Sequence, residues 1–259
     1  MLILLPPSEG KTAPRRGRPL DLGSLSFPML TPARQQVLAS LADLCAGDPA
    51  AAASVLGLGR TQLGEVERNA ALATAPTARA DTVYTGVLYE ALDLPSLTGA
   101  DKRRAGAWVA TTSSLFGLVR PGDRIPAYRL AGDVTLPGLG GVAAHWRRTL
   151  EPAVLEAAGS GLVLDLRSTT YAGFWRPTGE VAARVATVRV LHEVDGVRKT
   201  VSHFNKATKG RLVRALVTGG EGPRTPAGLA ELLGDHGWQV ELGERTPTGT
   251  RLDVVITEL

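Results

Sequence analysis

The sequence is poor in several residue types, and each scarcity argues against a class of protein. Its 259 residues include one cysteine, Cys45, so no internal disulfide can form and no cysteine-rich zinc site is expected. The four histidines show none of the spacings of a zinc centre, so no metal and no cofactor are predicted. No apolar run approaches the ~20 residues of a membrane span, and the apolar start is too short for a signal peptide. The sequence therefore predicts a cytoplasmic protein without membrane contact.

The charge balance is basic, with a net charge of +4 at pH 7. A positive sum points only weakly to nucleic acid or other anions, because the distribution of charge matters more than its total. Strand-like and helical patterns alternate along the chain, without internal repeats. We therefore expect a single mixed α/β domain over residues 1–259, in which helices flank a mixed sheet.

Hydrophobic periodicity and turn residues predict the main elements. Strands are expected at 1–5, at 162–166, on both sides of the Asp195-Gly196 turn, at 238–242 and at 252–257. Helices are expected at 31–44, 48–56, 142–158, 204–217 and 225–233. The stretch 82–92 begins like a strand and continues as a helix.

The opening LILLPPSEGKT invites comparison with a nucleotide-binding P-loop. Gly10, Lys11 and Thr12 match the second half of that motif, whereas its first glycine would fall on Leu5. Two prolines and no helical period follow, so the required helix N-terminus is missing. We therefore interpret Lys11 as a cation that a strand-ending loop places at the mouth of a basic cleft.

The stretch VLGLGRTQLGEVERNAAL places Gly57 and Gly59 between two expected helices. Over residues 50–72 this pattern is that of a helix-hairpin-helix element. In such an element turn amides and a helix N-terminus hold a DNA phosphate without reading sequence, and Arg60 would add a cation. The competing interpretation is a glycine C-cap followed by a tight turn. The residues leave both open.

Three groups of cations fall at element boundaries, where backbone amides also face outward. They are Lys11 with Arg15, Arg16 and Arg18; Arg120 with Arg124 and Arg129; and Lys206 with Lys209 and Arg211. The small polar residues beside them are Ser8, Thr12, Ser168, Thr169 and Asn205, and the alternating aromatics are Tyr84, Tyr128 and Tyr171. Each group alone is typical of solvated surface charge. Together they favour a phosphate-binding cleft whose aromatics either stack on bases or fill the core.

Catalytic patterns are sparse. No G-x-S-x-G elbow or G-x-G-x-x-G fingerprint occurs. Asp165 at a strand end is a candidate general base, yet a lone carboxylate there more often pairs with an arginine such as Arg167. An enzyme acting on a nucleotide, nucleobase or other small anionic metabolite therefore stays open as the alternative, with Asp165, Ser168 and Tyr128 as its polar groups.

Five segments resemble the YaaA family of bacterial peroxide-stress-resistance proteins. In family order they are MLILLPPSEGKT, VYTG at 83–86, SSLFGLVRPGDRIPAYRL at 113–130, LDLRSTTY at 164–171 and SHFNKATKGRLVRALV at 202–217. The resemblance covers nearly the whole chain. It implies a single mixed α/β domain containing a helix-hairpin-helix element, and a basic cleft that binds DNA. It also implies a role in limiting intracellular iron and oxidative DNA damage.

By position, the resemblance assigns to the cleft Lys11, Tyr84, Thr85, Gly86, Arg120-Pro121, Tyr128, Arg129, Lys206 and Lys209. The further candidates for contacts to DNA or another anion are Ser8, Thr12, Gly57, Gly59, Arg60, Arg124, Arg167, Ser168 and Asn205. We expect contacts to the backbone of duplex or branched DNA with little sequence preference.

The chain departs from the family pattern at two places. Many members begin SPAKT, whereas this chain inserts Glu9 and Gly10 before the lysine. Many carry ASDEY where this chain has LRSTTY, so Arg167 and Thr169 stand in place of acidic residues. The second departure removes carboxylates that shared acid–base chemistry at this site would need.

Overall fold

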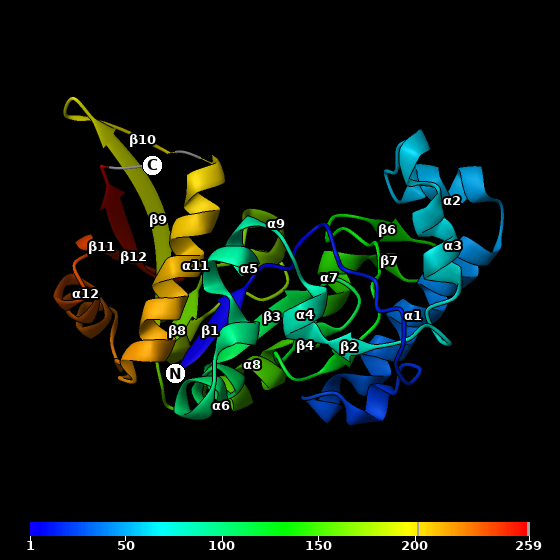
Figure 1. The fold of residues 1–259 in the computed structure, drawn as a ribbon, viewed down its shortest axis with the longest axis horizontal. Helices are drawn as coiled ribbons and strands as arrows, with labels where there is room; N and C mark the ends of the chain where they lie inside the picture. The colour runs from blue at the N-terminus through cyan, green and yellow to red at the C-terminus, as the bar shows by residue number, and fades with distance from the viewer. Residues whose placement is uncertain (201, 258–259) are drawn as a thin grey trace.

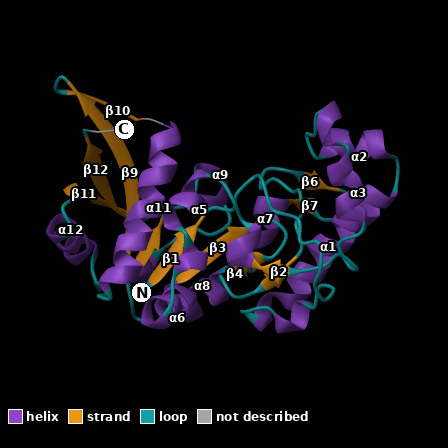
Figure 2. Ribbon diagram, in the orientation of Figure 1, coloured by secondary structure: helices purple, strands orange, loops and turns teal. Residues whose placement is uncertain are grey.

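The computed structural model of the protein describes residues 1–200 and 202–257. Its largest sheet has eight strands in the order β11-β12-β9-β8-β1-β3-β4, with β10 paired to the end of β9 (Figures 1 and 2). These strands are β1 (Leu2–Leu5), β3 (Val109–Ser113), β4 (Gly117–Val119), β8 (Val163–Asp165), β9 (Val185–Val194), β10 (Val197–Thr200), β11 (Gln239–Thr246) and β12 (Gly249–Ile256). Two small ladders stand apart, β2 (Ala78–Arg79) with β5 (Arg124–Ile125) and β6 (Thr135–Leu136) with β7 (Gly140–Gly141).

The opening strand β1 lies inside the sheet, with a parallel neighbour on each side. Ile3 stands opposite Val109 of β3 and Leu164 of β8. All four residues of β1 have 0% exposure. A continuous apolar run is typical of a parallel strand that is covered on both faces, and this is why the first residues of the chain form a central strand. Strands β8, β9 and β12 continue the parallel arrangement.

Helices cover the sheet and also gather at one end of the molecule. Helix α11 (Ser202–Gly219) packs against α5 (Val87–Leu92), α6 (Gly99–Trp108) and β9, and α12 (Pro226–Asp235) packs against β11 and β12. In Figure 1, α1 (Thr31–Ala46), α2 (Pro49–Val55) and α3 (Gly64–Ala70) lie together at the end opposite β10 and β11. The remaining helices are α4 (Ala80–Val83), α7 (Val142–Arg147), α8 (Glu151–Ala158), α9 (Thr169–Ala172) and α10 (Gly179–Ala182), with 3-10 turns at Leu22–Ser24, Pro28–Leu30, Arg60–Gln62 and Leu94–Ser96.

The predicted fold class and most predicted elements are confirmed, and two predictions are wrong. Residues 82–92 do not begin as a strand of the sheet, because Thr82 and Val83 end α4 and Tyr84 forms only an isolated bridge to Lys11. Their helical continuation is confirmed as α5, which follows Gly86 with a φ of 95°. The single helix expected at 142–158 is two helices, α7 and α8. Pro152 lies in the first turn of α8. Since proline cannot donate a backbone hydrogen bond, it favours a new helix start over continuation of α7.

Two expectations drawn from scarce residue types can be checked in this fold. Cys45 is buried and unpaired, and burial raises the pKa of its thiol. Among the helices of the described residues, none is both long and apolar enough to cross a membrane.

Candidate functional site

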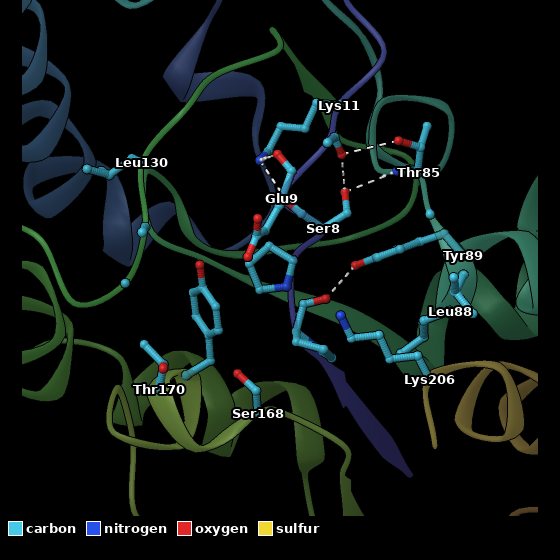
Figure 3. A pocket seen from close by; sticks show the side chains of 18 of the residues that line it. Ser8, Glu9, Lys11, Thr85, Leu88, Tyr89, Leu130, Ser168, Thr170 and Lys206 are labelled. Atoms are coloured by element: carbon cyan, nitrogen blue, oxygen red, sulfur yellow. Dashed lines mark hydrogen bonds between the residues drawn. The ribbon is translucent and has the colours of Figure 1, made fainter. Parts of the chain in front are cut away.

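A pocket of about 710 Å³ opens where β1 and β8 end (Figure 3). The carboxyl ends of neighbouring parallel strands reach the same edge of a sheet, and ligand sites gather there. The loop after β1 and the short helix α9 after β8 form two walls. Residues 85–89, residues 129–133 and Lys206 of α11 complete the lining. The volume lies within the range of roughly 300–1,000 Å³ that is typical of small-molecule sites.

The loop after β1 is held in place by its own polar groups. Ser8 Oγ donates to the carbonyl of Gly10 at 2.6 Å and accepts the amide N–H of Thr85 at 3.1 Å. Thr85 Oγ1 donates to the same Gly10 carbonyl at 3.2 Å, as the dashed lines of Figure 3 show. Gly10, one of the two residues inserted relative to the family pattern, therefore joins the loop to the segment before α5.

Lys11 folds back over this loop. Its Nζ donates to the carbonyl of Ser8 at 2.8 Å and to that of Glu9 at 3.4 Å. The same atom lies 4.2 Å from the ring centroid of Tyr128 and 5.7 Å from that of Tyr84. No helix occurs in residues 12–21, which confirms that this lysine does not belong to a P-loop. It does stand at the end of a strand and at the edge of a pocket.

The surroundings of Lys11 disfavour its charge. Burial, followed by the positive charge of Arg129, lowers the pKa of Lys11 to about 7, and the carboxylates of Glu65 and Glu9 offset only part of this effect. The two ring faces and the two carbonyls favour the ammonium, but they do not outweigh its desolvation. A lysine of this kind is neutral in a large share of the molecules at neutral pH.

All four tyrosines of the chain gather at this site. Tyr84 and Tyr128 are buried beneath the loop with their hydroxyl oxygens 3.1 Å apart, and the Tyr128 hydroxyl lies 2.7 Å from Ser113 Oγ. Tyr89 and Tyr171 line the pocket itself. Burial raises the pKa of every one of these phenols. They therefore stay protonated at neutral pH and supply apolar ring surface and hydroxyl groups.

Among the described residues, three cationic side chains line the pocket, those of Lys11, Arg129 and Lys206. Arg129 Nη1 donates to the Glu9 carbonyl at 3.3 Å, and Nη2 lies 3.5 Å from the Glu9 carboxylate. Asn69 of α3 holds the backbone of Arg129 on both sides, because its Oδ1 accepts the N–H at 3.0 Å and its Nδ2 donates to the C=O at 2.7 Å. Lys206 is exposed near the start of α11.

The structure brings together about half of the residues selected from the sequence. The pocket lining contains Ser8, Lys11, Thr85, Gly86, Arg129, Ser168 and Lys206, and Tyr84 and Tyr128 lie directly beneath it. Thr12 is exposed and outside the lining, with its amide donating to the carbonyl of Val83 at 2.9 Å.

Other expected cations are engaged elsewhere. Arg120 donates to the carbonyl of Ala107 at 2.6 Å, and Arg124 donates to that of Thr77 at 2.7 Å. Arg167 forms two bonds of 2.8 and 2.7 Å to the carboxylate of Asp165, and its side chain is only 1% exposed. Pairing of this strand-end carboxylate with Arg167 is thereby confirmed. The Arg167 guanidinium is consequently not free to contact a ligand.

Two polar residues of α11 that were selected from the sequence, Asn205 and Lys209, are not part of the pocket lining. Lys209 is partly buried, and burial lowers its pKa while Asp165 acts in the opposite direction. Asn205 Oδ1 is buried and has no hydrogen-bond partner among the described residues.

Gly57 and Gly59 lie in the short connection between α2 and α3, where the chain makes a tight turn. Gly57 has a φ of 63°, and Arg60 begins the 3-10 turn that leads into α3. Gly57, Gly59 and Arg60 lie outside the pocket lining. The segment is thus two short helices with a glycine-containing connection, and phosphate binding by it stays a prediction. Helix α3 contributes to the pocket indirectly, because its Asn69 holds the backbone of the lining residue Arg129.

The loop beyond Lys11 presents Arg15, Arg16 and Arg18 to solvent. Its backbone is fixed at Arg18, whose carbonyl accepts the Thr77 N–H at 3.0 Å and the Thr77 hydroxyl at 2.8 Å. Gly17 has a φ of 151°, and a Cβ there would lie 2.3 Å from the Thr77 carbonyl oxygen. These arginines therefore project from an anchored loop.

Sequence reasoning did not select several lining residues, among them Glu9, Tyr89, Asp133 and Thr170. Glu9 was visible as an insertion, but its contacts to Arg129 come from a distant segment. The signal that would have found Tyr89 is the rarity of tyrosine: with only four in the chain, each one near a cation merits inspection.

The sheet and the pocket at its carboxyl edge define a mixed α/β protein with a strand-end pocket. The chain belongs to the family described as peroxide stress protein YaaA, whose sequence model matches residues 1–241. It is 56% identical over 262 residues to a UPF0246 protein of Streptomyces coelicolor, with 100% of both chains covered. It is 44% identical over 248 residues to a UPF0246 protein of Corynebacterium efficiens, with 94% of this chain and 96% of that protein covered. An uncharacterized protein of Campylobacter jejuni is 28% identical over 221 residues, with 82% and 83% covered.

Proposed function

We propose that this protein binds the phosphate backbone of DNA during peroxide stress and thereby limits iron-dependent DNA damage. The family description supports the link to peroxide stress. The observation that carries DNA binding is a group of three exposed arginines, Arg15, Arg16 and Arg18, on the loop that leads away from the pocket after Lys11. Within residues 1–200 and 202–257, no carboxylate lies within ion-pair distance of these three arginines.

The arrangement of these cations supports binding with little sequence preference. Contacts to phosphates position a protein on DNA but carry no sequence information. The arginines project from a loop that is anchored at Thr77, rather than from a helix that could enter a groove and read base edges. Neutralised phosphates release counterions, so the affinity should fall steeply with salt.

The salt dependence of affinity tests this proposal. Binding of a fluorescent 20-base-pair duplex is measured between 50 and 200 mM salt for the wild type and for a triple Arg15→Gln, Arg16→Gln, Arg18→Gln variant. Loss of three phosphate contacts should reduce the slope of log K against log salt by about 2.7. The matched control replaces Lys102 and Arg103, which are exposed on α6 at the amino edge of the sheet, by Gln. Undetectable wild-type affinity, or a slope that the triple variant leaves unchanged, overturns the proposal.

A second candidate function is binding or conversion of a small anionic metabolite such as a nucleotide. The volume of the pocket favours it, because about 710 Å³ matches a small-molecule site better than a groove that accepts a duplex along its length. A thermal-shift screen of nucleotides and sugar phosphates tests it. No shift with any compound, with DNA binding intact, removes this candidate.

A further inference from the structure

The amine of Lys11 differs from an ordinary phosphate-binding lysine in its partners. It is held by two backbone carbonyls, those of Ser8 and Glu9, and no carboxylate forms an ion pair with it among the described residues. The amine nitrogen also lies over the ring of Tyr128. Arg129 shares the Glu9 carbonyl with it. The site therefore fixes the direction of this amine while a neighbouring cation disfavours its protonation.

A neutral lysine amine is a nucleophile toward carbonyl carbon. Desolvation and a nearby cation are the two means by which proteins activate a lysine for imine formation, and both act on Lys11. An ordinary lysine is neutral in only about one molecule in a few thousand at pH 7. Lys11, with a pKa of about 7, is neutral in a much larger share.

The other walls of the pocket suit a phosphorylated sugar. Arg129 and Lys206 supply positive charge for a phosphate, and Ser168 and Thr170 bring hydroxyl groups from the α9 side, as Figure 3 shows. The ring of Tyr171 adds a surface for the carbon skeleton. A volume of about 710 Å³ admits a free sugar phosphate or one nucleotide unit that has been turned out of a duplex.

We propose that Lys11 forms an imine with the aldehyde of an anionic sugar phosphate in this pocket, supplied either by an abasic site in DNA or by a free sugar phosphate. The neutral Nζ attacks the aldehyde carbon and a C–N bond forms. The nitrogen then loses both of its hydrogens, and the former carbonyl oxygen leaves with them as water, which gives N=C. The step consumes no oxidant or reductant. Where the aldehyde is supplied by an abasic site in DNA, this inference rests on the proposed function.

Reductive trapping tests the inference. The full-length protein is incubated with sodium cyanoborohydride and one of three aldehydes: a duplex with a single abasic site, 2-deoxyribose 5-phosphate, or 2-deoxyribose without phosphate. Mass spectrometry of peptides then locates the adduct. We expect an adduct on Lys11 with a phosphorylated aldehyde, at a rate at least tenfold above that with the unphosphorylated sugar. The abasic duplex and the free sugar phosphate distinguish the two sources.

Two variants keep the test decisive. Lys11→Arg retains the charge but not the nucleophile, and it should lower trapping at least tenfold, whereas Lys102→Arg should leave it unchanged. Mapping is required because burial also lowers the pKa of the Met1 amine. An adduct confined to Met1 or Lys206, or equal trapping by Lys11→Arg, overturns the inference. A melting curve confirms that Lys11→Arg is folded. If Lys11→Arg does not fold, Lys11→Met replaces it in the same trapping experiment.

Affinity for an intact duplex separates this inference from the proposed function. If the wild type binds the duplex with a steep salt dependence but no aldehyde traps on Lys11, the imine inference fails and DNA binding stands. If the free sugar phosphate traps on Lys11 and the duplex does not bind, DNA binding fails and the imine inference stands.

Discussion

Lys11 and Arg129 donate to one oxygen atom, the carbonyl of Glu9, at 3.4 and 3.3 Å. Two cations are thus held side by side over the pocket, and the only carboxylate shown to pair with either is that of Glu9 itself, among the residues described. Their mutual repulsion is one cause of the low pKa of Lys11. An anion that enters the pocket relieves that repulsion, so anion binding and protonation of Lys11 favour each other.

Removing Arg129 should raise the pKa of Lys11. In Arg129→Met the neighbouring positive charge is lost, while burial and the carboxylates of Glu9 and Glu65 stay. The ammonium is then favoured, and the pH midpoint for acetylation of Lys11 by acetic anhydride should move above about 7, as followed by mass spectrometry. Lys206→Met is the control and should leave the midpoint in place. An unchanged midpoint in Arg129→Met contradicts this account of the electrostatics.

Removing the Lys11 amine should stabilise the protein at low pH. The pKa of Lys11 is about 7 in the folded state and ~10.4 in an unfolded chain. Between these values the unfolded state binds more protons, so wild-type stability rises with pH over this window, and below pH 7 the whole penalty is present. Lys11→Met lacks the penalty, so its stability relative to wild type should be higher at pH 6 than at pH 9.5, by more than about 1 kcal/mol because one unit of pKa shift corresponds to about 1.4 kcal/mol.

Urea unfolding at pH 6 and at pH 9.5 measures this difference. The advantage of Lys11→Met should shrink at the higher pH. The exposed Lys102 is the control, since Lys102→Met should show the same difference from wild type at both pH values. A Lys11→Met advantage that does not depend on pH would count against a low pKa of this lysine.

Gly17→Ala should release the arginine loop from its anchor. The added Cβ would lie 2.3 Å from the Thr77 carbonyl oxygen at a φ of 151°. Such a clash with backbone costs typically 1–3 kcal/mol. The loss should appear in urea unfolding, together with a changed salt slope for DNA. Gly64→Ala, at the start of α3 with open space around it, should be neutral or slightly stabilising. Equal stability of the two variants contradicts the anchoring role of Gly17.

Asp165→Asn should destabilise the fold without changing the pocket. It leaves the Arg167 guanidinium buried without its counter-charge, which costs roughly 3–5 kcal/mol. The comparison is Glu193→Gln in the more exposed pair with Arg198, where a loss within about 1 kcal/mol is expected. Duplex affinity of the folded Asp165→Asn protein should match wild type, because neither Asp165 nor Arg167 lines the pocket. A selective loss of affinity would assign this pair a direct role in binding.

Local sequence patterns predicted an element correctly where the residues that determine it lie within one segment. The apolar run at 2–5 predicted a strand buried on both faces, and Asp195-Gly196 predicted a hairpin, in which both residues have a positive φ, 51° and 73°. The two wrong elements have different causes. The β-branched and aromatic residues at 82–85 favour a strand by their intrinsic propensity, yet α4 extends to Val83. At 142–158 the average composition favours one continuous helix, but Pro152 starts a second one.

The pocket was predictable only in part, because free and engaged cations look alike in a sequence. Arg129 and Arg167 both occur near polar residues in loops, yet one faces the pocket and the other is buried against a carboxylate. The nearby Asp165 was a usable signal for the second case. The environment of Lys11 had no local signal, since the bond between Arg129 and Glu9 joins positions that are 120 residues apart.

The central position of β1 in the sheet determines how early the protein can fold during its synthesis. This strand is made before both of its partners, which are residues 109–111 on one side and 163–165 on the other. During synthesis on the ribosome, the apolar residues of β1 lack one of their two neighbouring strands until β8 has left the exit tunnel. Pairing between such distant segments is slow, and an unpaired apolar strand is prone to aggregation in the meantime. The pocket at the end of β1 therefore assembles late, and a nascent chain that stops before β8 lacks both the finished sheet and the site.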